Sequence, residues 1–416
     1  MKIGSSHDGV LYGTRGLTVG AWRPETGFEP RGTLPNPDVP FTGKQQVNFG
    51  PLNRWWAKRL LSPATGWYTT TNVWPVDGDT LLATVGRCVY RSGDGGRSWR
   101  RVYDLPMASG PMGTLPTSFC EHDGRLYLAE YTFADVPARI LVSEDDGRSW
   151  STFFERPRYR HFHGVFHDPH ADRLWATTGD TDAESAIGYF DDGEFREVGR
   201  GSQRWRAVGL TFTPDAILWG MDCSYSEAVR VFRLGREELR TDEPEPDVVH
   251  VVDSSVFYAE TLAVGDERWV VVSTAAEVGL DDTAPSGSQN SCTRSARVLA
   301  ASSRSNYEHW HEVYAFRRRR MLNEHLPKLP AASAYVFLAA DDEVGVAVNP
   351  FNTTAHNGEI LTITPERLAG AAGREAVGDA IDRRSLAPTR GVDREERPLD
   401  DRPIATEIAG EPDVAP

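Results

Sequence analysis

Two octapeptides decide the fold of this chain: SGDGGRSW at Ser92–Trp99 and SEDDGRSW at Ser143–Trp150. Both fit the pattern Ser-x-Asp-x-Gly-x-x-Trp, and they begin about 50 residues apart. In such a pattern the Ser and Asp side chains can hydrogen-bond the amides of a turn, Gly supplies an unusual φ, and Trp covers the strand pair. We therefore predict two equivalent β-hairpins.

A longer repeat surrounds these hairpins. Short apolar stretches recur along the chain, and a polar turn such as His7–Gly9 or Asp77–Asp79 precedes most of them. The seven copies are Leu11–Thr14, Leu81–Thr84, Leu126–Ala129, Leu174–Thr177, Leu218–Met221, Trp269–Val272 and Gly345–Val348. A period of about 40 to 50 residues with several strands is typical of β-propeller blades. We predict an all-β propeller of seven four-stranded antiparallel blades, with six blades or a shared closing blade as the alternative.

The octapeptides resemble the Asp-box, or BNR repeat, of sialidase-like β-propellers. In that family the Asp-box lies at the edge of a blade, so the resemblance implies a fold and gives these residues a structural role. Sialidases also carry an Arg-Ile-Pro motif near the first blade. The nearest stretch here, Arg15–Leu17, lacks it. The resemblance therefore implies the propeller more strongly than it implies sialidase activity.

The spacing of the repeats also predicts the domain organisation. The propeller should occupy residues 1–368, with insertions at about 34–66 and 279–294. The first insertion contains a stretch at 53–61 that favours a short helix. Residues 369–416 are charged and Pro-rich without apolar periodicity, which predicts a disordered tail.

Composition limits the classes of function. The 416 residues include 45 Lys+Arg and 60 Asp+Glu, a net charge of −15 that argues against nucleic acid and anionic membranes as partners. No apolar run approaches the roughly 18 residues of a membrane span, and no secretory signal is visible, so we expect a cytoplasmic protein. None of the four cysteines forms a CxxC pair, which favours reduced thiols. Only four basic residues are lysine, a composition that resembles proteins of salt-loving organisms.

The richest chemistry lies in the fourth repeat. His161 and His163 stand two apart, so on a strand both side chains point to the same face. Asp180 follows the second strand of the same repeat and should lie just above them. A His-x-His pair with a carboxylate can chelate a divalent metal, and it can equally supply a base. We predict a catalytic role for all three and keep metal binding by His161 and His163 as an alternative beside a purely structural role.

Neighbouring repeats offer further candidates. If 201–207 is a strand, Arg204 and Arg206 share one face and can bind a carboxylate or sulfate. Asp222 takes the position that Asp180 has in the preceding repeat. The remaining candidates are Tyr258 and Glu260, which resemble the activated tyrosine of sialidases, and Glu130 and Arg87, which follow other second strands. An ion pair between blades is the structural alternative for Arg206 and Asp222.

Together these residues suggest an acid, a base and an anion clamp at one channel mouth. The leading hypothesis is a glycoside hydrolase or uronate lyase acting on an acidic or surface glycan. The histidines are more similar to those of propeller lyases of uronate polysaccharides, in which a base removes the proton α to a carboxylate that arginines neutralise. The alternative is a non-catalytic propeller that binds a glycan or a protein. No P-loop, dinucleotide fingerprint or Ser-His-Asp spacing is present.

Overall fold

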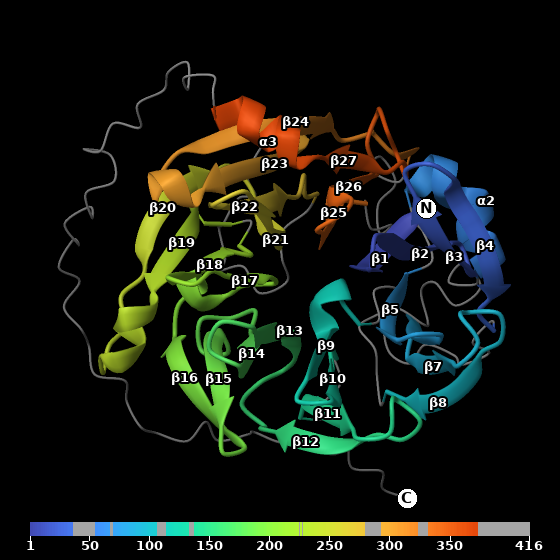
Figure 1. Ribbon diagram of the computed structural model, residues 1–416, viewed down its shortest axis with the longest axis horizontal. Coiled ribbons are helices and arrows are strands. Elements are labelled where there is room, and N and C mark those ends of the chain that lie inside the picture. Colours follow the sequence, from blue (N-terminus) through green and yellow to red (C-terminus); the bar gives the residue numbers. More distant parts are fainter. Residues whose placement is uncertain are drawn as a thin grey trace, which may run out of the picture. The chain divides into compact units, whose positions relative to one another are not determined.

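The computed structural model of the chain is a β-propeller (Figure 1). It describes residues 1–35, 55–66, 70–105, 114–132, 137–223, 225–226, 228–278, 293–322 and 332–372. The first predicted insertion falls partly outside these ranges, and the second falls almost wholly outside them. The predicted tail also lies outside the described residues, apart from its first four positions, which belong to a helix.

Seven sheets surround one axis, as predicted, and each is built from consecutive strands (Figure 1). The first three blades are β1 (Lys2–His7), β2 (Val10–Arg15), β3 (Thr18–Arg23), β4 (Gly27–Thr33); β5 (Thr71–Asp77), β6 (Thr80–Val85), β7 (Cys88–Ser92), β8 (Arg100–Asp104); and β9 (Phe119–His122), β10 (Arg125–Ala129), β11 (Arg139–Ser143), β12 (Ser151–Glu155). The next two are β13 (Phe162–Asp168), β14 (Arg173–Thr178), β15 (Ala186–Asp191), β16 (Glu194–Arg200); and β17 (Leu210–Phe212), β18 (Ala216–Gly220), β19 (Val229–Gly235), β20 (Asp247–Val252). The last two are β21 (Val256–Val264), β22 (Glu267–Thr274), β23 (Ser295–Ser302), β24 (Trp310–Arg317); and β25 (Tyr335–Asp341), β26 (Gly345–Phe351), β27 (Leu361–Ile363).

The ring closes by packing rather than by a shared strand. Six blades have four antiparallel strands and the seventh has three in the described part of the chain. Strand β1 of the first blade lies beside β25 of the seventh. This excludes both the six-blade alternative and the shared closing blade.

All seven apolar repeats are the second strands of their blades, as predicted. They carry the core between blades. Trp175, Trp219 and Trp269 lie in β14, β18 and β22, and all three are almost fully buried.

The first octapeptide closes the hairpin between β7 and β8. Ser92 Oγ accepts a hydrogen bond from the Gly96 amide at 2.9 Å, and Asp94 Oδ1 accepts one from the Ser98 amide at 2.9 Å. Hydrogen bonds from the Ser98 side chain and amide hold the pKa of Asp94 well below its usual range. Gly96 has φ +91°, and the Trp99 indole donates to its carbonyl oxygen at 3.0 Å. The predicted roles of Ser, Asp, Gly and Trp are all visible here.

The second hairpin, between β11 and β12, gives a direct test of this network. Buried Ser143 Oγ accepts from the Gly147 amide at 2.8 Å and donates to Asp145 Oδ1 at 2.8 Å. Ser143→Ala leaves the buried amide without this acceptor, so we expect a loss of about 1–3 kcal/mol in the free energy of unfolding. Urea titration measures it, and Ser149→Ala, which removes only an exposed hydrogen bond to Asp145 Oδ2, should cost clearly less than Ser143→Ala. Equal losses would contradict the role assigned to Ser143.

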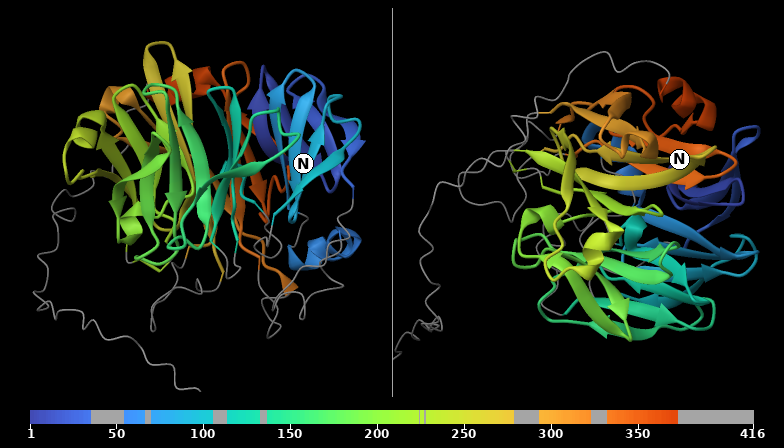
Figure 2. Two further views of the ribbon diagram at one scale, coloured as in Figure 1. Left: turned by 90° about the horizontal axis from the view of Figure 1, so that it is seen from below. Right: turned by 60° about the vertical axis from the view of Figure 1, so that its left-hand side comes forward.

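We call one end of the propeller the entry face: the end at which the innermost strand of each blade begins and the second strand ends. Helix α2 (Trp55–Thr65) precedes β5 and lies at this end (Figure 2), while α3 (Pro365–Ala372) follows β27. Helix α2 confirms the short helix predicted in the first insertion. Within the described chain, no helix is both long and apolar enough to cross a membrane.

Candidate functional site

The two predicted histidines face each other where β13 begins on the entry face. Their Nε2 atoms are 3.1 Å apart, and both side chains are buried. The pairing of β13 with β14 shifts register between Phe162 and Gly164, so the strand bulges at His163. The prediction that His161 and His163 point to one face is confirmed.

Asp180 lies against both imidazoles, in the loop that follows β14. Its Oδ2 is 3.3 Å from His161 Nε2, and its Oδ1 is 3.5 Å from His163 Nε2. Arg206 Nη2 approaches Oδ1 to 3.0 Å, and Arg160 donates to Oδ2. One buried carboxylate thus holds two imidazoles and two guanidiniums.

Arg206 joins this group to the next blade. It donates to the Asp180 carbonyl oxygen at 3.0 Å, and its Nε is 3.3 Å from Asp222 Oδ2. Asp222 follows β18 as Asp180 follows β14, so equivalent loops of adjacent blades supply the two carboxylates. We call His161, His163, Asp180, Arg206 and Asp222 the entry-face cluster. All five are buried.

Burial and hydrogen bonding set the protonation of the cluster. Burial is the largest influence on Asp180 and acts to raise its pKa, but hydrogen bonds from His161 and His163 outweigh it and hold the pKa well below its usual range. Burial lowers the pKa of His161. His163 Nδ1 lies 3.1 Å from the Ala207 carbonyl oxygen, which can only accept a hydrogen bond. His163 Nδ1 therefore donates to Ala207, and Nε2 is the ring nitrogen that faces Asp180 and His161.

Two further neighbours, Tyr131 and Arg160, border this cluster. The Tyr131 ring centroid lies 4.2 Å from that of His161 and 5.8 Å from that of His163. Arg160 is about one third exposed and also lies 3.9 Å from Glu184. Arg160 directly precedes the His-x-His pair in the sequence, and this position was the signal that could have identified it. Arg160 and Tyr131 form the border between the cluster and the more exposed surface.

The prediction that Arg204 and Arg206 share one face is wrong. Residues Gln203–Trp205 form a 3-10 turn rather than a strand, so side chains do not alternate between two faces there. Arg204 points outward, is 40% exposed, and pairs with Glu245 at 2.6 Å. Only Arg206 turns into the cluster.

Glu130 and Arg87 do not join the cluster either. Glu130 is buried and binds Arg139 in the same blade, with Oε1 2.6 Å from Arg139 Nη2. Burial raises the pKa of Glu130, although Arg139 works against this. Arg87 lies in the turn between β6 and β7 of the second blade, with the third blade between it and the cluster.

Tyr258 and Glu260 lie on β21, the inner strand of the sixth blade. Tyr258 lines a small cavity between the inner strands, whose walls are Lys2, Thr70, Thr114, Leu115, Pro116, Tyr258, Tyr335 and Phe337. Glu260 is half-buried, and burial raises its pKa to about 7 although the Ala340 amide donates to it. Tyr258 and Glu260 therefore lie on another blade than His161 and His163, among different neighbours.

Lys2 is the charged group of this cavity, and sequence reasoning missed it. Its Nζ donates to the Thr71 carbonyl oxygen at 2.7 Å and to Asn72 Oδ1 at 2.9 Å, and it lies 4.7 Å from the Phe337 ring centroid. Two sequence signals for Lys2 were available. The alternation of side chains along the first strand directs it inward, and lysine is rare in this chain.

Burial of Lys2 makes stability depend on pH. Burial lowers its pKa from 10.5 to about 7, so between these values the unfolded chain holds a proton that the folded chain does not. We expect the free energy of unfolding to rise from pH 7 toward pH 10 by on the order of a few kcal/mol, a rise that Lys2→Met should remove. Urea titrations of both proteins across this range measure the difference. Parallel pH profiles would contradict a buried, proton-losing Lys2.

The spacing of His161, His163 and Asp180 fits a metal ion, but the charges around them do not. Their facing atoms are 3.1–3.5 Å apart, close to the roughly 3.3 Å expected between ligands of a tetrahedral site with bonds of about 2.0–2.1 Å. Both oxygens of Asp180, however, are already bound by guanidiniums. A cation here would add charge to a group that Arg160 and Arg206 have neutralised.

Comparisons with known proteins show the fold alone. No family model and no curated protein matches this chain. Similar solved structures include YCF48 from Cyanidioschyzon merolae (14% identity, 83% of this chain and 88% of that chain, TM-score 0.42) and the Pan2 WD40 domain of Neurospora crassa (11%, 83% and 83%, TM-score 0.42). An ancestral GH74 enzyme is similar over 86% of this chain and 45% of its own length, at 11% identity and TM-score 0.47. These likenesses give no evidence of function, which has to be argued from the site.

Proposed function

We propose that this protein is a carbohydrate-active propeller that cleaves an acidic glycan by β-elimination at the entry-face cluster. The observation that supports this most is the placement of His163 Nε2 within 3.5 Å of a carboxylate that also binds two arginines. A base beside arginines is the set of groups needed to remove a proton α to a sugar carboxylate.

The protonation of Asp180 favours elimination over hydrolysis. A glycoside hydrolase needs a carboxylic acid that still holds its proton near neutral pH. The pKa of Asp180 is held far too low for that role. Glu260 has a raised pKa, but it lies on the inner strand of the sixth blade, and the cluster belongs to the fourth and fifth. Asp180 therefore does not fit the role of that acid.

In the proposed reaction, His163 Nε2 removes the C5 proton of a uronate residue. The electron pair of the C5–H bond becomes the C4=C5 double bond, and the C4–O4 bond breaks. The departing oxygen takes a proton from the imidazolium, and the pair of Nε2 atoms at 3.1 Å allows His161 to share that proton. Arg160, with its five donors and partial exposure, would bind the sugar carboxylate. No oxidant, metal or cofactor is needed for the balance.

Acidic oligosaccharides test the proposal directly. Purified protein is incubated with uronate-containing oligosaccharides, with and without EDTA, and the products are followed by ultraviolet absorbance and by reducing-end assay. Unsaturated products in both arms support elimination by the histidines. Loss of activity in EDTA would show that the reaction needs a metal ion and would contradict a metal-free elimination, and reducing ends without absorbance would favour hydrolysis.

A second reading is a non-catalytic glycan- or protein-binding propeller. It is favoured by the charge balance of the cluster, because both carboxylates already have guanidinium partners and none of the five residues is more than about a tenth exposed. In that case the cluster would brace the fourth and fifth blades. Binding of an acidic glycan without any product would support this reading.

The remaining sequence predictions stay predictions. They are the Asp-box resemblance of the two hairpins, the halophilic origin suggested by composition, and the cytoplasmic location. The disordered tail and the second insertion belong with them.

A further inference from the structure

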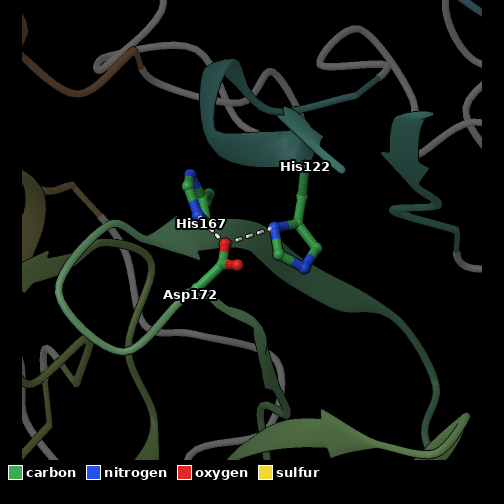
Figure 3. Close-up of side chains that lie close together, drawn as sticks. All are labelled: His122, His167 and Asp172. Carbon is green, nitrogen blue, oxygen red and sulfur yellow. Dashed lines mark hydrogen bonds and ion pairs between the residues drawn. The ribbon is translucent and has the colours of Figure 1, made fainter. Parts of the chain in front are cut away.

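We propose that His122, His167 and Asp172 form a binding site for a divalent transition metal of the Zn²⁺ class, at the end of the propeller opposite the entry face (Figure 3). His122 ends β9, His167 lies near the end of β13, and Asp172 belongs to the turn between β13 and β14. His163 and His167 are four residues apart on one strand, about 13 Å along it. The site is therefore separate from the entry-face cluster.

The three side chains converge on one point (Figure 3). Asp172 Oδ1 is 3.1 Å from His167 Nε2 and 3.5 Å from His122 Nδ1. One ligand atom from each residue lies within 4.8 Å of the others, and the imidazole centroids are 4.7 Å apart. Ligands of a tetrahedral metal with bonds of about 2.0–2.1 Å lie roughly 3.3 Å apart, so little movement would bring these atoms around an ion.

Charge distinguishes this group from the cluster on the entry face. Two guanidiniums neutralise Asp180. Within the described residues, Asp172 is paired with His122 and His167 alone, so its negative charge has no cationic partner when the histidines are neutral. Of the two His-His-Asp groups, this one has the charge that a divalent cation needs.

Hydrogen bonding also favours a ligand here. His122 Nδ1 is buried, and in the described part of the chain it makes no hydrogen bond of good geometry, although it is directed at Asp172 Oδ1. A metal ion between the two atoms would satisfy the nitrogen lone pair. Asp172 is 85% exposed at its side chain, which leaves room for water at the remaining positions.

The turn that carries Asp172 is firmly anchored. Buried Asp168, at the end of β13, accepts two hydrogen bonds from Arg236 at 2.7 and 2.8 Å and one from the His170 amide at 3.0 Å. Asp172 itself has φ +49°, a left-handed conformation that Asp tolerates better than most residues. The third and fourth blades thus present three ligands whose positions are largely set before an ion arrives.

Zn²⁺ binding to untagged full-length protein tests the site by isothermal titration calorimetry. We expect one site in the wild type. His167→Ala and Asp172→Asn should each lose at least about 100-fold in affinity, because each removes a metal ligand. Removing a residue that only orients a metal ligand already costs about 10- to 100-fold. His170→Ala is the matched control: an exposed histidine in the same turn, expected to leave binding unchanged.

Thermal unfolding of each variant with and without Zn²⁺ separates a loss of metal binding from a folding defect, because each variant is compared with itself. Since the ion binds the folded state, it should raise the Tm of the wild type and of His170→Ala, but not that of His167→Ala or Asp172→Asn. No binding to the wild type would overturn the proposal. So would binding that survives both substitutions and disappears in His163→Asn.

Discussion

Arg206→Met is expected to lower the free energy of unfolding by about 3–5 kcal/mol, the usual loss when one partner of a buried ion pair is removed. Arg206 is the cation that lies between Asp180 and Asp222, and all three side chains are buried. Methionine fills much of the same volume, so the loss reflects the two carboxylates left without their shared guanidinium. Chemical unfolding followed by tryptophan fluorescence measures it.

Arg204→Met is the matched control for this prediction. Arg204 precedes Arg206 by two residues, is 40% exposed, and forms a surface pair with Glu245. Exposed pairs contribute about 0–1 kcal/mol, so this variant should remain close to the wild type. If the two variants lost the same stability, the account of a buried charge network between the fourth and fifth blades would fail.

His163→Asn is expected to lower the rate of uronate elimination by roughly 10²–10⁴-fold, the usual contribution of a general base. The asparagine amide can replace Nδ1 as donor to the Ala207 carbonyl oxygen, now at 3.1 Å, but it supplies no basic nitrogen at the position of Nε2. The variant therefore separates a chemical role from a structural one. Initial rates of product absorbance on an acidic oligosaccharide measure the effect.

Two comparisons sharpen this second prediction. His170→Ala, an exposed residue of the β13–β14 turn, should retain the full rate. The Tm of His163→Asn should stay within a few degrees of the wild type, because the hydrogen bond to Ala207 is kept. A variant that loses stability but keeps its rate per folded molecule would identify His163 as a structural residue.

The fold could be predicted because the repeat encodes its packing. Each copy marks the second strand of a blade, and the tryptophans of three such strands, Trp175, Trp219 and Trp269, are almost fully buried. Turn residues such as Asp77–Asp79 separate the first two strands of a blade. The number of blades follows from counting these copies. In the described residues the seventh blade has three strands rather than the predicted four.

The site could be predicted where strand rules apply. His161 and His163 meet as predicted, although His161 precedes β13 and the strand bulges at His163, and Asp180 and Asp222 share a position because each follows the second strand of its blade. Arg204 was wrong because a 3-10 turn replaced the expected strand.

The contacts of a side chain with residues far away in the sequence could not be predicted. Glu130 has a position like that of Asp180, yet it binds Arg139 of its own blade instead of joining the cluster. Asp172 and His122 come from different blades, and nothing local in either stretch indicates that they meet. Such contacts depend on how neighbouring blades are rotated against each other, which the repeat does not encode.

The central claim is that the entry-face cluster removes a proton from an acidic sugar, and the ultraviolet spectrum of the products tests it most directly. Wild type and His163→Asn are compared on the same uronate-containing oligosaccharides, with reducing ends counted in parallel. The account predicts absorbance of an unsaturated uronate that grows with the reducing ends in the wild type and is nearly lost in His163→Asn. Reducing ends without absorbance, or equal absorbance from both proteins, would contradict it.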